Sequence, residues 1–182
     1  MGTPALGSYL DACSSLKWKT RLRSFNAIYQ LVNTTYSREE HLSAKEFKQV
    51  IRGYLLHLND DRDEIVEIVQ ESLQMLFEVS DEEMTRYISD LLPKILANLA
   101  TRKSNLLKRG ATNLLALITE EQTPDVLTSS LLEMLVGKQK NLKVTLLVLE
   151  LLNKKIESCE EFFLEDANVK YAIDAICKVL TK

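Results

Sequence analysis

The chain has 182 residues, of which 27% are charged and 46% hydrophobic, and it carries a net charge of −3 at neutral pH. This length and composition predict one soluble globular domain over residues 1–182, standing alone or as a segment of a larger protein, with enough chain to bury a core. The acidic balance argues against a nucleic-acid-binding surface spread over the molecule, because such a surface normally brings a basic excess. We therefore expect no nucleic-acid partner.

No apolar run approaches the ~20 residues of a membrane-spanning helix, and the N-terminal stretch MGTPALGSYLDAC lacks the positive and long apolar segments of a secretion signal. We expect no membrane partner. The three cysteines, Cys13, Cys159 and Cys177, are widely spaced and lie among helix-like residues. Reduced core thiols explain them better than disulfides or metal ligands, which favours an intracellular protein of the cytoplasm.

Apolar residues recur at spacings of three and four, and only five glycines and three prolines interrupt the chain, so the pattern predicts amphipathic helices. In chain order, such stripes run through residues 65–76, 84–99 and 107–118. Residues 141–152, NLKVTLLVLELL, are apolar nearly all round, which is typical of a buried helix. Pro93 lies within a stripe, where we expect it to bend the helix.

Short polar segments divide these helices into pairs. The loops expected within pairs are LKWK at 16–19, LNDDRD at 58–63, LATRKSN at 99–105 and VGKQKN at 136–141. Between pairs, Ser37 and Ser80 are each expected to cap the helix that follows, the second through a capping box with Glu83.

The four loops recur at a nearly constant spacing. From Trp18 to Asp60, Arg102 and Lys140 the steps are roughly 42, 42 and 38 residues, close to the ~40–47 of HEAT and armadillo repeats. The sequence therefore predicts an all-α, HEAT/armadillo-like α-solenoid paddle of about five helix pairs, the fifth a less regular unit over residues 158–182. Because stacked repeats place equivalent loops side by side, we expect the four loops to line up along one edge.

Nothing in the sequence indicates catalysis. The histidines, His41 and His57, have no partners at zinc-ligand spacing, and no glycine-rich phosphate loop, nucleophile elbow or catalytic triad pattern is present. Acidic clusters such as DDRDE and DEE stand at helix starts, where the helix dipole favours negative charge. We expect a binding module and no enzyme, with no cofactor and no bound metal.

The only tryptophan of the chain stands in a basic stretch. The segment SSLKWKTRLRSF places Trp18 among Lys17, Lys19, Arg21 and Arg23, outside any apolar stripe. An exposed ring flanked by cations suits a binding hot spot, where large aromatics and arginine contribute most of the energy. The alternative is that the ring tucks back between the first two helices and belongs to the core.

Three of the four loops carry a motif: W-K-x-R-L at 18–22, R-K at 102–103 followed by Leu106, and K-N-L-K-V at 140–144. In this order and spacing the motifs resemble the TOG domain of microtubule-associated proteins, a HEAT-like paddle that binds the tubulin heterodimer through its intra-repeat loops. The resemblance covers most of the chain. It implies tubulin as the partner, with other cytoskeletal, centrosomal or ciliary proteins as further candidates. It also implies a location in the cytoplasm on the cytoskeleton, at a microtubule, spindle, centrosome or cilium.

Carried onto this sequence, the resemblance implies a tubulin-binding edge made of Trp18, Lys19, Arg21, Asp60, Arg62, Arg102, Lys103, Lys138, Lys140, Asn141 and Lys143. Tubulin's surface is strongly acidic, so basic side chains along one edge would steer the encounter. Two features depart from the family, which usually has six repeats and places a small polar pair and a valine in the second loop. Here that loop, NDDRDE, is acidic and is expected to oppose tubulin, so that Asp60→Asn with Asp63→Asn would strengthen binding.

Two alternative functions fit the same fold. A HEAT or armadillo scaffold would bind a peptide or another protein in its groove, with Lys108, Asn113 and Lys154 on the second helices lining that groove. A degenerate TOG domain would keep the shape but lose tubulin, which the acidic second loop favours. The sequence does not choose between a tubulin-binding domain and a degenerate one.

Overall fold

The structure, a computed structural model, describes residues 4–121, 124–137, 141–158 and 177. Within these residues the chain forms eight α-helices, a short 3-10 helix and no strand. In chain order they are α1 (Pro4–Cys13), α2 (Trp18–Ser37), α3 (Ala44–His57), α4 (Asp63–Met84), η1 (Thr85–Tyr87), α5 (Ile88–Thr101), α6 (Asn105–Glu121), α7 (Pro124–Val136) and α8 (Leu142–Ser158). The predicted all-α fold class is confirmed.

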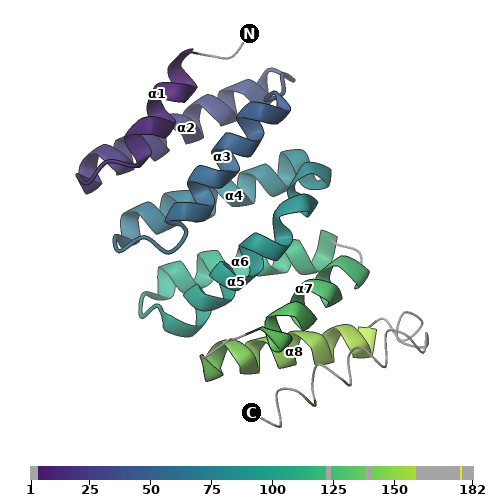
Figure 1. Ribbon diagram of the computed structural model, residues 1–182. Coiled ribbons are helices and arrows are strands. Elements are labelled where there is room, and N and C mark those ends of the chain that lie inside the picture. The colour runs from purple at the N-terminus through teal and green to yellow at the C-terminus, as the bar shows by residue number, and fades with distance from the viewer. Residues whose placement is uncertain (1–3, 122–123, 138–140, 159–176, 178–182) are drawn as a thin grey trace.

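The helices pair in sequence and stack into a two-layered α-solenoid (Figure 1). Helices α1, α3, α5 and α7 pack in succession in one layer, and α2, α4 and α6 do so in the other, where α8 follows and packs on α5 and α7. Four helix pairs therefore stand where the loop spacing predicts them. The fifth unit, expected over residues 158–182, lies outside the described residues apart from Ser158 and Cys177.

The connections within the first three helix pairs lie on one side of the paddle. In Figure 1 the turns between α1 and α2, α3 and α4, and α5 and α6 follow one another down the left side, where α7 also ends and α8 begins. The connections between α2 and α3 and between α4 and α5 lie on the opposite side. We call the first side the loop edge; it comprises residues 14–19, 58–63, 102–106 and 141–143 together with the neighbouring side chain of Arg21.

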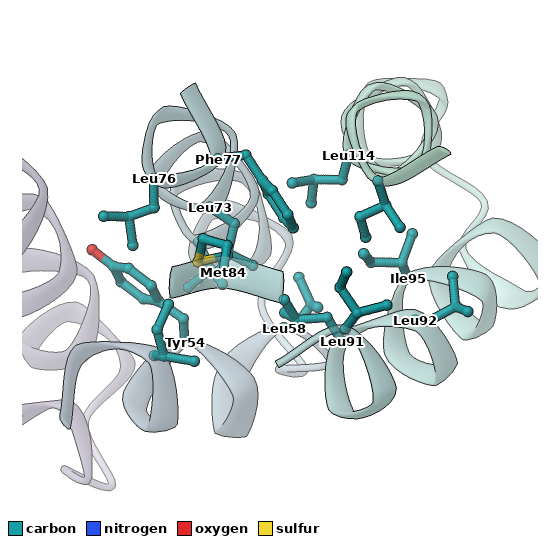
Figure 2. Packing of buried hydrophobic residues seen from close by; sticks show 14 of the residues in the cluster. Tyr54, Leu58, Leu73, Leu76, Phe77, Met84, Leu91, Leu92, Ile95 and Leu114 are labelled. Atoms are coloured by element: carbon teal, nitrogen blue, oxygen red, sulfur yellow. The ribbon is translucent and has the colours of Figure 1, made fainter. Parts of the chain in front are cut away.

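The apolar stripes predicted from the sequence form the core of the paddle. Fully buried members of the stripes of α4, α5 and α6 include Leu73, Leu76, Leu91, Ile95 and Leu114. Figure 2 shows these side chains meeting between helices of successive pairs, together with Tyr54 from α3. Because protein interiors are close-packed and stiff, this core gives the loop edge a firm support.

Helix α8 departs from the prediction of a buried helix. Val144, Val148 and Leu152 are buried, but Leu142 and Leu146 are 70% and 51% exposed. Within the described part of the chain, α8 packs on the paddle through one face. A helix that is apolar all round is expected to be buried on every side. The exposure of Leu142 and Leu146 is therefore unexpected, and Leu142 lies at the loop edge.

Both predicted caps differ from the structure. Ser37 is the last residue of α2, and the capping box belongs to Ser43 and Glu46 at the start of α3. Ser80 does interrupt a helix, since its backbone is non-helical inside α4 (φ −151°, ψ 42°), but its hydroxyl donates to the Tyr36 hydroxyl at 2.8 Å. Pro93 lies inside α5 as predicted.

Side-chain amides tie neighbouring helix pairs together. The buried Gln70 of α4 donates from Nε2 to the Leu107 carbonyl of α6 at 3.2 Å, and Gln74 donates to the Gly110 carbonyl at 3.3 Å. Gly110 has no side chain, and a Cβ at this position would collide with the Gln70 amide. The glycine therefore permits the close approach of α4 and α6.

Candidate functional site

The first contact at the loop edge joins the loops of the first two helix pairs. Arg21, in the first turns of α2, donates to Oδ1 of Asp60 at 2.9 Å and to Oδ1 of Asp61 at 3.1 Å. The side chains of Arg21 and Asp60 are only 13% and 5% exposed, whereas that of Asp61 is 77% exposed. Arg21 also donates to the backbone carbonyls of Ser15 and Leu16, at 3.0 and 3.3 Å. One guanidinium thus orders two loops.

The Asp60 carboxylate has two further donors. Nδ1 of His57 lies 2.7 Å from Oδ2, and because an ionised carboxylate only accepts, that nitrogen carries the proton. The backbone N–H of Arg62 donates to Oδ1 at 3.0 Å. Burial alone would raise the pKa of Asp60, but the hydrogen bonds from His57, Arg21 and Arg62 outweigh it and hold that pKa well below its usual range. Asp60 is therefore a buried anion with all its partners in place.

The third loop reaches the same residue. Arg102 donates to the backbone carbonyl of Asp60, to Oδ1 of Asn98 at 3.1 Å and to Oδ1 of Asp63 at 3.1 Å. Asn98 in turn donates to the carbonyl of Leu58 at 2.9 Å. The loops of three successive helix pairs are thereby cross-linked at the second loop.

This network corrects the interpretation of the acidic second loop. The Asp60 carboxylate lies beneath the surface and is bonded to Arg21, so it does not present a free charge to a partner as the sequence suggested. Asp61 and Asp63 remain largely exposed, but each is paired with an arginine. Sequence alone shows six polar residues in a row; the burial of one of them depends on donors that lie about 40 positions away.

Trp18 is the first residue of α2. The sequence left open whether its ring is exposed or belongs to the core, and the structure shows an intermediate position. Its ring is half-buried and packs against the core, so it is neither a free surface residue nor a core residue alone. The Arg62 guanidinium stands 5.4 Å from the ring centroid and the Lys19 ammonium 5.7 Å. Both distances suit a cation–π contact. Trp18 thus joins the first loop to the second at the loop edge.

The remaining predicted site residues divide into exposed, half-buried and undescribed ones. Lys19, Arg62, Lys103 and Lys143 are exposed, as is Lys17 beside Trp18. Asn141 is half-buried, and its side-chain oxygen accepts from the Lys143 backbone N–H at 3.0 Å. Lys138 and Lys140 lie outside the described residues. The structure therefore links five of the predicted residues through a chain of direct contacts: Trp18, Arg21, Asp60, Arg62 and Arg102. Lys103 directly follows Arg102 in the sequence.

Three leucines at the loop edge were not singled out as site residues from the sequence. Leu16 is 99% exposed, Leu106 is 56% exposed, and Leu142 lies at the start of α8 with most of its surface free. They come from the first, third and fourth helix pairs. The available signal was that Leu16 stands outside every apolar stripe, next to lysine. Leu16, Leu106 and Leu142 thus add exposed apolar surface to the loop edge.

The described residues hold no group of three or more His, Cys, Asp or Glu that could bind a metal ion. His41 is exposed and packs edge-on against Tyr36 at 5.6 Å, and His57 is bonded to Asp60. No described helix combines the length and the apolar character needed to cross a membrane.

Two shallow grooves lie on the layer of second helices. Asn113 lines the one between α4 and α6, with Glu67 and Arg109, and Lys154 lines the one between α6 and α8. Lys108, the third residue expected there, is half-buried. The residues that line the groove between α4 and α6 are mostly polar and include charges of both signs.

No family model and no curated protein sequence matches the chain. Among solved structures, the N-terminal domain of MAST/Orbit, known from a crystal structure, is similar with a TM-score of 0.61 and 15% sequence identity. The similarity covers 95% of this chain and 82% of that one. The two domains thus share the same helical paddle over nearly the whole of this chain.

Proposed function

We propose that this chain is a tubulin- or microtubule-binding module that contacts tubulin through its loop edge. The observation that carries the proposal is that the loop edge exposes leucines next to lysines on one side of a rigid paddle. These are Leu16 beside Lys17, Leu106 near Lys103, and Leu142 beside Lys143. Support also comes from the loop motifs, which resemble those of TOG domains, and from the shared fold with the MAST/Orbit domain.

The chemistry of the edge suits an acidic protein surface. Lysines there raise the rate of encounter with such a surface, and apolar side chains contribute the contacts that slow dissociation. The three acidic side chains of the second loop are already paired, Asp60 and Asp61 with Arg21 and Asp63 with Arg102. The charge that the edge offers to a partner is therefore more basic than the acidic second loop suggests. We place the protein on the cytoskeleton, at a microtubule, spindle, centrosome or cilium.

The test compares two charge reversals of equal size. Lys103→Glu with Lys143→Glu changes the loop edge, whereas Lys45→Glu with Lys48→Glu changes the start of α3 on the opposite side. Binding to immobilised tubulin dimers, measured at two salt concentrations, is expected to weaken for the first pair and to stay near wild type for the second. Equal effects of both pairs would show that only net charge matters and that the loop edge is not the binding surface.

The groove between α4 and α6 is the basis of a second candidate function, the binding of a peptide by a HEAT-like scaffold. If wild-type protein shows no binding to tubulin at roughly 10–50 μM, a range in which weak transient partners still register, the domain is a degenerate TOG domain or a scaffold. Asn113 and Arg109 in this groove would then be the first residues to substitute in a search for a peptide partner.

A further inference from the structure

We infer that Asp60 is a positioning residue, which holds Arg62 over the ring of Trp18 and fixes the first loop, and so sets the shape of the loop edge. This inference rests on the proposed function for its biological meaning. Its structural content concerns the isolated protein alone. According to this inference, Asp60 supports the loop edge from within and does not itself contact the partner.

The link from Asp60 to Trp18 passes through Arg62. The Arg62 backbone N–H donates to Oδ1 of Asp60, which fixes where the Arg62 side chain leaves the second loop. Its guanidinium then stands 5.4 Å from the Trp18 ring centroid although its side chain is exposed to solvent. A long exposed side chain normally loses conformational freedom when a partner binds, and a preformed stack reduces that cost.

The link from Asp60 to Leu16 passes through Arg21. The same Oδ1 atom accepts from Arg21, whose guanidinium also holds the carbonyls of Ser15 and Leu16. Leu16 itself is almost completely exposed and has no packing that would fix it. Its position therefore depends on its backbone, and the backbone depends on the ion pair between Arg21 and Asp60.

Asp60→Asn removes the buried carboxylate and leaves the exposed Asp61 as the remaining ion partner of Arg21. Arg21 is 13% exposed and already donates to Asp61 at 3.1 Å, so in this variant we expect its guanidinium to move toward solvent or closer to Asp61. Either movement withdraws a donor from the first loop. The expected result is a folded paddle whose first two loops are no longer held in one arrangement.

The experiment uses the single tryptophan as a probe at the edge itself. Emission of Trp18 and its quenching by acrylamide are measured in the free protein for wild type, Asp60→Asn and the matched control Asp61→Asn. Asp61 is adjacent, loses the same charge and is 77% exposed. Asp60→Asn is expected to shift the emission to longer wavelength and to increase quenching, whereas Asp61→Asn leaves both near the wild-type values.

Tubulin affinity is measured for the same three proteins. Asp60→Asn is expected to weaken binding at least about tenfold, in contrast to the strengthening expected from the sequence, and Asp61→Asn is not expected to weaken it. If Asp60→Asn lowers the melting temperature but leaves Trp18 emission and quenching unchanged, Asp60 only stabilises the fold and the inference is wrong.

A second variant covers the case in which Asp60→Asn does not fold. Arg21→Lys keeps the charge but loses the forked contacts to two loops, and it is expected to change Trp18 emission in the same direction. Unchanged emission in folded Arg21→Lys would also overturn the inference. If wild type does not bind tubulin while the emission responds as expected, the positioning role stands and the proposed function fails.

Discussion

The side chains of Arg21 and Asp60 meet at 2.9 Å although they stand 39 residues apart and belong to different helix pairs. Arg102, in the third pair, bonds the backbone of the same aspartate. The acidic second loop is therefore the point at which the loops of three pairs are joined. We therefore expect stability, the geometry of the loop edge and the response to pH to depend on the Asp60 carboxylate.

The first prediction concerns how the stability contributed by Asp60 changes with pH. The folded pKa of Asp60 lies below its unfolded value of about 3.9, so the ionised carboxylate stabilises the fold fully above about pH 5, and this stabilisation is lost as the pH falls toward the folded pKa. At pH 7, Asp60→Asn is expected to lower the free energy of unfolding by about 3–5 kcal/mol. The gap from wild type should narrow by about 1 kcal/mol between pH 5 and pH 3.

Urea unfolding of wild type, Asp60→Asn and Asp61→Asn at pH 7, 5 and 3 measures this gap. Asp61 is an exposed partner of the same arginine, and exposed ion pairs contribute about 0–1 kcal/mol, so its variant should differ little from wild type at every pH. A gap for Asp60→Asn that is as large at pH 3 as at pH 7 would contradict the assignment of the effect to the charged carboxylate.

Periodicity and spacing predicted most of the fold. The stripes with Leu73, Leu91 and Leu114 are buried, and the helix pairs stand where the loop spacing placed them. Local signals were less dependable. The S-x-x-E pattern at Ser43 forms a capping box, whereas the same pattern at Ser80 stands at a break inside α4, where the Ser80 hydroxyl donates to Tyr36. Tyr36 lies 44 positions away in the sequence, so this contact is not visible in the local pattern.

The candidate site was predicted in outline and missed in detail. Repeat spacing predicts that loops share an edge, and the structure places Trp18 beside Arg62 there. The burial of Asp60 depends on donors from the first and third helix pairs. The sequence of an acidic loop is the same whether its carboxylates face a partner or an arginine of a neighbouring loop, so this burial could not be predicted. The exposure of Leu16 is equally invisible, since leucine normally indicates core.

The second prediction tests the contact between α4 and α6. Gly110→Ala gains helix propensity worth about 0.5–1 kcal/mol but displaces the Gln70 amide, whose buried hydrogen bond to Leu107 is then lost at a cost of about 1–3 kcal/mol. Net destabilisation of about 1 kcal/mol is expected from thermal or urea unfolding. In a Gln70→Ala background the same substitution should stabilise the protein, because the obstacle is gone.

The change from destabilisation in the wild-type background to stabilisation in the Gln70→Ala background would show that the Gln70 side chain is the obstacle. Gly110→Ala that stabilises the protein in both backgrounds would show that the Gln70 side chain moves aside at no cost. Gly110→Ala that destabilises both equally would place the obstacle in the backbone instead of in the glutamine.

The third prediction separates the apolar and basic parts of the loop edge. Leu16→Ser removes an almost fully exposed side chain, so the free energy of unfolding should stay within about 0.5 kcal/mol of wild type. Tubulin should dissociate faster, with little change in association rate. Lys103→Glu should instead slow association and weaken its salt dependence, because exposed charges act over distance.

Surface-based kinetics with immobilised tubulin separate the two rates. Val79→Ser serves as the control, since Val79 is a partly exposed apolar residue near the end of α4 remote from the loop edge. The assignment of Leu16 to the interface is contradicted when Leu16→Ser and Val79→Ser dissociate from tubulin at the same rate as wild type.

The last prediction concerns Trp18, whose half-buried ring gives it two roles. Trp18→Ala removes packing against the core and also the surface on which Arg62 stacks. We expect a loss of stability of about 2 kcal/mol, less than for a fully buried tryptophan, and a loss of tubulin affinity of at least about 2 kcal/mol, roughly thirtyfold. Thermal melts and binding isotherms on the same preparations measure the two effects.

Trp18→Phe distinguishes these roles, because it keeps an aromatic ring against the core but has a smaller face for Arg62. Its stability should lie close to that of wild type, while its tubulin affinity should fall between wild type and Trp18→Ala. A Trp18→Ala variant that melts earlier but binds tubulin as tightly as wild type would make the ring a core residue only. Binding would then depend on Leu16, Leu106 and the lysines of the edge.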